Sequence, residues 1–213
     1  MYELYVITDE GLSNGLSHAE TAKLACEGGA DVIQLRDKYM SRSELFAAAK
    51  EIRRITSLHD VLFFVNDHLD IAIASEADGV HLGQSDMSIL YAADIAPEYM
   101  QIGISVSTPD EAAAAEKSGA DYVGLGPVFG TSSKHDAGSA LGLNALREVR
   151  RFIDIPIVAI GGITKDNAAS VISAGADGVA VISAVVSQKD VKKATEELKK
   201  IVDDAVRASK GRR

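Results

Sequence analysis

The chain has 213 residues, of which 46% are hydrophobic and 25% are charged, a composition typical of a soluble globular protein. Its formal net charge of −9 argues against nucleic acid or an anionic membrane as a partner, and no apolar run approaches the roughly 18 residues of a membrane span. The N-terminus, MYELYVITDE, lacks the basic and apolar regions of a secretory signal, so we expect a cytoplasmic location.

Short apolar runs and helical segments alternate along the whole chain. Strands are expected at ELYVIT near residue 5, at 61–65, 101–105 and 156–160. Four more are expected directly after the tripeptides at 29–31, 76–78, 119–121 and 175–177. Helices are expected at 17–28, 41–57, 68–75, 87–93, 108–118, 142–151, 165–173 and 189–208, with Thr108 and Thr164 at N-cap positions. Eight strand–helix units predict an α/β fold, a single (β/α)8 TIM barrel over residues 1–213, with 207–213 as a frayed tail. An open doubly wound sheet is the alternative.

A repeated tripeptide precedes every second strand. Gly-Ala-Asp begins at Gly29, Gly119 and Gly175, and Glu-Ala-Asp begins at Glu76. Each copy follows a helical segment and precedes a run of Val, Ile and Leu, which is the pattern of a tight turn at the N-terminal face of a barrel. Sequence at that face serves stability, so we expect function at the opposite ends of the strands.

Reactive side chains form no nucleophilic or transition-metal pattern. The single cysteine, Cys26, stands where a helix faces the core, so a buried thiol is expected. The five histidines show no paired ligand spacing, and neither a Ser-His-Asp order nor a nucleophile elbow is present. His81 points either into the barrel or toward the helices, and we favour a packed structural role, with contact to a substrate as the alternative.

Two sets of anion-binding groups are expected at the strand exits. Gly161-Gly162 with Thr164, and Ile182-Ser183, follow strands 7 and 8, where barrel enzymes often bind phosphate through backbone N–H groups. Glycine at such positions also simply permits tight turns. Arg36, Lys38 and Lys134 follow strands 2 and 6, and together they indicate a second, more highly charged phosphate group.

Asp67 and Asp86 follow the adjacent strands 3 and 4, so both carboxylates can reach one hard cation. Mg²⁺ prefers one or two carboxylates together with water and phosphate oxygens, and a bound diphosphate would complete such a site. The alternative is that each residue is the N-cap of the helix that follows it.

Eight ordered segments of this chain resemble the thiamine-phosphate synthase family. They are YVITD (5–9), GADVIQLRDK (29–38), FVNDHLDIA (64–72), ADGVHLGQSDM (77–87), IGISV (102–106), ADYVGLGPVFGTSSK (120–134), IPIVAIGGI (155–163) and GADGVAVIS (175–183). The resemblance implies a transferase that joins 4-amino-2-methyl-5-hydroxymethylpyrimidine diphosphate to a thiazole phosphate, releasing diphosphate before the thiazole nitrogen attacks the pyrimidine-methyl cation. The partners that it implies are small phosphorylated substrates, whereas the net charge argues against nucleic acid and membrane, and assembly into a homo-oligomer stays open.

The resemblance also implies roles for individual residues. The pyrimidine diphosphate would be bound by Gln34, Leu35, Arg36, Asp37, Lys38, Asn66, Ser105 and Lys134, and the thiazole phosphate by Thr131, Ser132, Ser133, Gly162, Ile182 and Ser183. Asp67 and Asp86 would hold Mg²⁺ as the cofactor, and Arg36, Lys38, Ser105 and Lys134 would act in catalysis. Gln34 would hydrogen-bond the pyrimidine edge.

The chain departs from the family pattern in the loop after strand 6, where Thr131-Ser132-Ser133-Lys134 replaces the usual Thr-x-Thr-Lys. Serine keeps the hydroxyl donor, so only the packing of the lost methyl group is in doubt. One alternative function is that of the thiazole tautomerase paralog, which uses a histidine after strand 5, where this chain has Ser105-Val106-Ser107. Another is a barrel that binds thiamine phosphates without catalysis.

Overall fold

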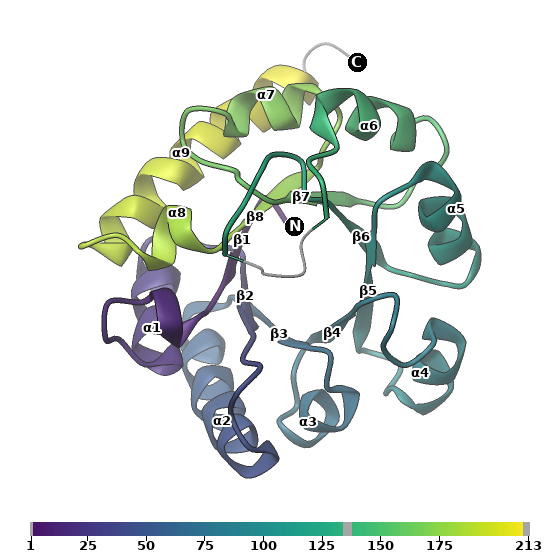
Figure 1. Cartoon of the computed structure of the whole chain (residues 1–213). Coiled ribbons are helices and arrows are strands. Elements are labelled where there is room, and N and C mark those ends of the chain that lie inside the picture. Colours follow the sequence, from purple (N-terminus) through teal and green to yellow (C-terminus); the bar gives the residue numbers. More distant parts are fainter. Residues whose placement is uncertain (1, 134–137, 211–213) are drawn as a thin grey trace.

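A computed structural model describes residues 2–133 and 138–210, and its strands close into a parallel barrel (Figure 1). Each strand pairs in parallel with its neighbours in the sequence, and the last pairs with the first. The strands are β1 (Leu4–Ile7), β2 (Val32–Leu35), β3 (Leu62–Asn66), β4 (Gly79–Leu82), β5 (Gln101–Val106), β6 (Tyr122–Leu125), β7 (Ile157–Ile160) and β8 (Gly178–Val181). The predicted (β/α)8 barrel is confirmed, and the open doubly wound sheet is wrong.

Helices surround the barrel on its outside (Figure 1). They are η1 (Glu10–Leu12), α1 (His18–Glu27), α2 (Arg42–His59), α3 (Leu69–Ala74), α4 (Ile89–Ile95), α5 (Pro109–Lys117), α6 (Gly142–Val149), α7 (Ala168–Ser173), α8 (Ser183–Val186) and α9 (Val191–Lys210). The short segments η1 and α8 were not expected from the sequence. Helix α9 includes residues 207–210, which the sequence placed in a frayed tail, and residues 211–213 lie outside the described part.

Polar side chains set the N-terminal ends of several helices. Ser17 and Ser41 form capping boxes with Glu20 and Glu44, and the Thr108 hydroxyl accepts the N–H of Glu111 as expected. The prediction for Thr164 is wrong. Its hydroxyl accepts the N–H of Asp166 in a turn, and α7 begins later, with Asn167 as its N-cap.

The repeated tripeptide forms the bottom of the barrel. In each copy the Asp carboxylate accepts the N–H of a residue at the start of the preceding odd-numbered strand, at 2.7–2.9 Å; the pairs are Asp31 with Leu4, Asp78 with Phe63, Asp121 with Ile102 and Asp177 with Ile157. The first residue of each copy has a positive φ: Gly29 (90°), Glu76 (59°), Gly119 (91°) and Gly175 (117°). Glycine adopts this conformation without strain, which explains three of the four copies. The repeat is therefore structural.

Side chains along each strand point alternately into the barrel and out toward the helices, and this separates two apolar cores. Residues that point inward fill the barrel with three tyrosines, Phe64 and smaller side chains, while their sequence neighbours pack between the barrel and the helices. Cys26 lies in the outer core and is buried, as expected. Of the helices in the described part of the chain, none has both the length and the apolar character needed to cross a membrane.

Candidate active site

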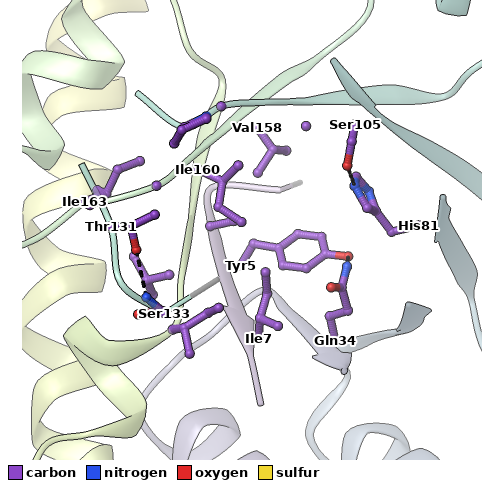
Figure 2. A pocket seen from close by; sticks show the side chains of 18 of the residues that line it. Tyr5, Ile7, Gln34, His81, Ser105, Thr131, Ser133, Val158, Ile160 and Ile163 are labelled. Atoms are coloured by element: carbon purple, nitrogen blue, oxygen red, sulfur yellow. Dashed lines mark hydrogen bonds between the residues drawn. The ribbon is translucent and has the colours of Figure 1, made fainter. Parts of the chain in front are cut away.

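A cavity of about 250 Å³ opens at the C-terminal ends of the strands (Figure 2). Strand ends and the loops that follow them supply its wall, so residues far apart in the sequence meet there. Among the residues predicted from the sequence, those that line it are Gln34, Arg36, Asn66, Ser105, Thr131, Ser133, Gly162, Ile182 and Ser183. The structure thus brings members of both predicted anion-binding sets to one cavity.

The segment after β2 divides between the cavity and the protein interior. Gln34 points into the barrel, while Leu35 is fully buried in the outer core and is not among the residues that line the cavity, so its predicted substrate contact stays a prediction. The Asp37 carboxylate accepts the N–H groups of Tyr39 and Met40, both at 2.7 Å, and lies 3.1 Å from a ring nitrogen of buried His18. Burial opposes the effect of these bonds, yet together they lower the pKa of Asp37. Asp37 therefore holds the loop that carries Lys38.

Two carboxyl groups lie beside the cavity, next to Asn66. The Asp67 and Asp86 side chains are close enough to share a hydrogen bond, and burial together with the Asp86 charge raises the pKa of Asp67 to about 6. The charges of Lys38 and Arg36 act on Asp67 in the opposite direction, so both cations also lie near this pair. The Arg36 guanidinium contacts the Asp9 carboxylate at 3.5 Å and is largely buried.

This pair fits a magnesium ion and does not fit a transition-metal cage. Within residues 2–133 and 138–210, no group of three or more His, Cys, Asp or Glu side chains is arranged to hold a metal. Magnesium needs fewer protein ligands, because it keeps water and takes phosphate oxygens from its substrate. The N-cap alternative is wrong for both residues, since His68 precedes α3 and Ser88 precedes α4.

Asp67 is also strained in a way that suits a functional role. It adopts a φ of 62°, in the left-handed region that aspartate enters at some cost, and its N–H donates to the carbonyl of His81 at 2.8 Å. Asp86 uses one oxygen to accept the N–H of Gly83 at 2.6 Å. Backbone contacts therefore hold both residues in place.

The opposite side of the cavity is built from the loops after β6, β7 and β8. Gly161 and Gly162 have φ values of 99° and 62°, and a Cβ at Gly162 would stand 2.5 Å from the carbonyl oxygen of Gly130. The Ser133 hydroxyl donates to that of Ser183 at 3.2 Å, which ties the β6 loop to the start of α8. These contacts explain why glycine and small hydroxyl residues occur here.

Ser132 of the β6 loop stands apart from this cavity wall. Ser132 is exposed and is not among the residues that line the cavity. Lys134 lies outside the described residues, so its predicted contact with the pyrimidine diphosphate stays a prediction.

Sequence reasoning missed most of the floor of the cavity. Tyr5 of β1 and Val158 and Ile160 of β7 line it (Figure 2), and so does Tyr122 of β6. His81 also points into the cavity, with one ring nitrogen 2.9 Å from the Tyr122 hydroxyl and the other 2.9 Å from the Ser105 hydroxyl. The alternation of side chains along β4 was the available signal, because Val80 and Leu82 are the apolar positions that face the helices.

Comparison with known proteins agrees with this arrangement. A family model described as thiamine monophosphate synthase matches residues 4–185. The chain is 57% identical over 201 residues to a thiamine-phosphate synthase of Methanocella arvoryzae, covering 94% of this chain and 95% of that protein. It is 50% identical to the thiamine-phosphate synthase of Pyrococcus furiosus, covering 96% of each chain.

Solved structures give the same result. The thiamine phosphate pyrophosphorylase from Pyrococcus furiosus superimposes with a TM-score of 0.90 at 49% identity, over 96% of this chain and 97% of that chain. A 3-hexulose-6-phosphate synthase, at 22% identity and a TM-score of 0.69 over 93% of this chain and 99% of that chain, shares the fold alone. On the evidence of the family model and these relatives, the chain belongs to the thiamine monophosphate synthase family.

Proposed function

We propose that the cavity joins 4-amino-2-methyl-5-hydroxymethylpyrimidine diphosphate to a thiazole phosphate, giving thiamine phosphate and diphosphate. The observation that carries the proposal is the asymmetry of the barrel mouth. One side has Asp67 with Asp86 and two cations whose charges act on Asp67, and the other has the glycine and hydroxyl groups of the β6, β7 and β8 loops. This arrangement supports one site for a diphosphate and one for a monophosphate.

The pyrimidine diphosphate would lie against β2, β3 and β5. Gln34 and Asn66 offer amide groups to the ring, and Arg36, Lys38 and Ser105 offer hydrogen-bond donors to the diphosphate. Because negative charge grows on the diphosphate as it leaves, donors already oriented toward it stabilise the transition state more than the ground state. We assign Lys134 to the same group on the family resemblance.

Asp67 and Asp86 would hold one Mg²⁺. When bound, the ion would neutralise charge on the leaving diphosphate. The raised pKa of Asp67 supports this assignment, since two carboxylates that repel each other are stabilised by a shared divalent cation.

The thiazole phosphate would be held by Thr131, Ser133 and Ser183 together with the backbone at Gly162 and Ile182, and we keep Ser132 as a further contact. This phosphate site would position the thiazole, because the short-lived pyrimidine-methyl cation is captured only by a nucleophile that is already in place. The enzyme would need no nucleophile of its own.

The test is diphosphate release from both substrates in the presence of Mg²⁺. Asp67→Asn combined with Asp86→Asn should lower the rate by about 10²-fold or more, because the ion that would neutralise the leaving diphosphate loses both of its protein carboxylates. Asp94→Asn combined with Asp166→Asn makes the same change in charge at two exposed positions and should keep the rate. If the first pair turned over like the control pair, the metal assignment would be wrong.

The same assay separates the alternatives. Isomerisation of the thiazole without condensation would support the tautomerase, and binding of both substrates without product would support a binding protein. The end of β5 and the residue that follows it, Ser105-Val106-Ser107, supply no histidine for proton transfer. A cytoplasmic location, a single domain over the whole chain and a homo-oligomer stay predictions.

A further inference from the structure

Five polar side chains form one continuous hydrogen-bonded chain across the barrel. The Gln34 amide nitrogen donates to the Tyr5 hydroxyl at 2.7 Å, and the Tyr5 and Tyr122 hydroxyls lie 3.1 Å apart. The chain continues from Tyr122 to His81 and from His81 to Ser105, at 2.9 Å in both steps. Figure 2 shows both ends, the pair of Tyr5 with Gln34 and the pair of His81 with Ser105, pointing into the cavity.

The first link favours one direction for the later ones. An amide nitrogen only donates, so the Tyr5 oxygen accepts from Gln34 and keeps its own hydrogen to donate, and the Tyr122 hydroxyl is within reach of that hydrogen. Burial raises the pKa of both phenols well above the usual value, so each carries its one hydrogen. When Tyr5 donates to Tyr122, Tyr122 donates to Nδ1 of His81, which is then unprotonated, and the hydrogen on Nε2 goes to the Ser105 oxygen.

We propose that Tyr5, Tyr122 and His81 are positioning residues in this polarised chain. Tyr5 and Tyr122 hold His81 as the Nε2–H tautomer, and His81 in turn leaves the Ser105 hydroxyl free to donate into the cavity. At the other end, the amide oxygen of Gln34 is left to accept a hydrogen bond. The chain therefore presents one donor and one acceptor at fixed positions on the cavity wall.

Those two ends match the proposed substrate, and this step rests on the proposed function. The oxygens of a diphosphate can only accept hydrogen bonds, so Ser105 serves them only if its own proton points outward. The amino group of the pyrimidine donates, so it needs an acceptor such as the Gln34 oxygen. With His81 in the opposite tautomer, Ser105 would donate to Nε2 of His81 and would have no hydrogen left for the diphosphate.

The polarity can be measured without any substrate. In NMR spectra of protein labelled with ¹⁵N at histidine, protonated and unprotonated ring nitrogens give well separated signals. The signals that disappear in the His81→Asn variant are those of His81. At a mildly alkaline pH, where imidazoles are neutral, we expect a bare Nδ1 and a protonated Nε2. The opposite tautomer in the unmodified protein would overturn the proposal.

A matched pair of variants tests the link through Tyr122. Tyr122→Phe removes the donor to Nδ1 and should give a mixture of the two tautomers. Tyr2→Phe makes the same change in a ring whose centroid is 4.9 Å from that of Tyr122, but its hydroxyl bonds Gln101 instead, so the tautomer should stay as in the wild type. Equal spectra from the two variants would contradict the proposal.

Kinetics give a second readout. Tyr122→Phe should lower kcat for diphosphate release about tenfold, the cost of one misdirected hydrogen bond, without changing KM for the thiazole phosphate. Tyr2→Phe should keep kcat near that of the wild type, and equal losses would contradict the positioning role. If the wild-type protein released no diphosphate, the proposed function would fail, while the tautomer would still decide the polarity.

Discussion

Gly162→Ala should disable the thiazole phosphate side of the cavity. The φ of 62° at Gly162 is left-handed, and an added Cβ would stand 2.5 Å from the carbonyl oxygen of Gly130 and 2.8 Å from Cβ of Phe129. Ordinary contact begins at 3.4 Å, so the β6 loop must retreat by about 0.9 Å, the difference between 2.5 and 3.4 Å. Thr131 and Ser133 belong to that loop and would move with it.

A misplacement of this size near reacting groups commonly costs about 10²-fold in rate, and we expect that loss in kcat/KM for the thiazole phosphate. Alanine in the left-handed region should also lower the free energy of unfolding by about 1–2 kcal/mol. Diphosphate release at varied thiazole phosphate concentration measures the first effect, and urea unfolding measures the second.

Gly130→Ala is the matched control. It lies on the facing loop, and nothing stands within 4 Å of the position its Cβ would take. We expect kcat/KM within about twofold of the wild type, since surface changes of this kind are usually small. If Gly162→Ala and Gly130→Ala gave the same kcat/KM, the close packing of the two loops would have no part in substrate positioning.

Three further predictions concern the scaffold. Asp177→Ala leaves the N–H of fully buried Ile157 without its 2.9 Å acceptor and should destabilise the protein by about 2 kcal/mol in urea unfolding, whereas Asp154→Ala, at an exposed site, should change little. Burial raises the pKa of Cys26 to about 12, so the thiol stays protonated below that pH. Cys26 should therefore react with alkylating reagents far faster in unfolded protein than in native protein, and equal rates would refute its burial. Glu76 has a φ of 59°, in the left-handed region, so Glu76→Gly removes a side chain from a strained backbone position. After the conformational entropy of glycine is counted, we expect a net gain of about 0.5 kcal/mol in the free energy of unfolding, measured as a higher unfolding temperature. A lower unfolding temperature would show that no strain is stored at this position.

The fold could be predicted because local signals agreed with one another. The Gly-Ala-Asp repeat marks the turns, since glycine supplies the positive φ at Gly29, Gly119 and Gly175. The boundary of α7 was missed because Thr164 and Asn167 both stand where an N-cap can form, and the hydrogen bonds that choose between them depend on the β7 loop. Short pieces such as α8 carry too few residues for periodicity to show.

The candidate site was predicted unevenly for a different reason. The resemblance assigned residues 34–38 as a block, but neighbours on a strand face opposite ways, so Gln34 points into the cavity while Leu35 packs under the helices. The hydrogen bond between Tyr5 and Tyr122 joins side chains 117 positions apart. No local pattern contains the register that brings them together, so the polar chain across the barrel had to come from the structure.

The two ends of this acidic barrel use aspartate in opposite ways. At the bottom, Asp177 is satisfied within the protein, since it accepts the Ile157 N–H and pairs with Arg150 at 3.0 Å. At the mouth, Asp67 faces Asp86, and its raised pKa means that Lys38 and Arg36 only partly offset burial and repulsion. A carboxylate whose charge the protein has balanced contributes to stability, whereas one whose charge is left unbalanced attracts a cation from solution. We therefore expect added Mg²⁺ to raise the unfolding temperature of the wild type and not that of the protein with both Asp67→Asn and Asp86→Asn. An equal rise in both would place the ion elsewhere.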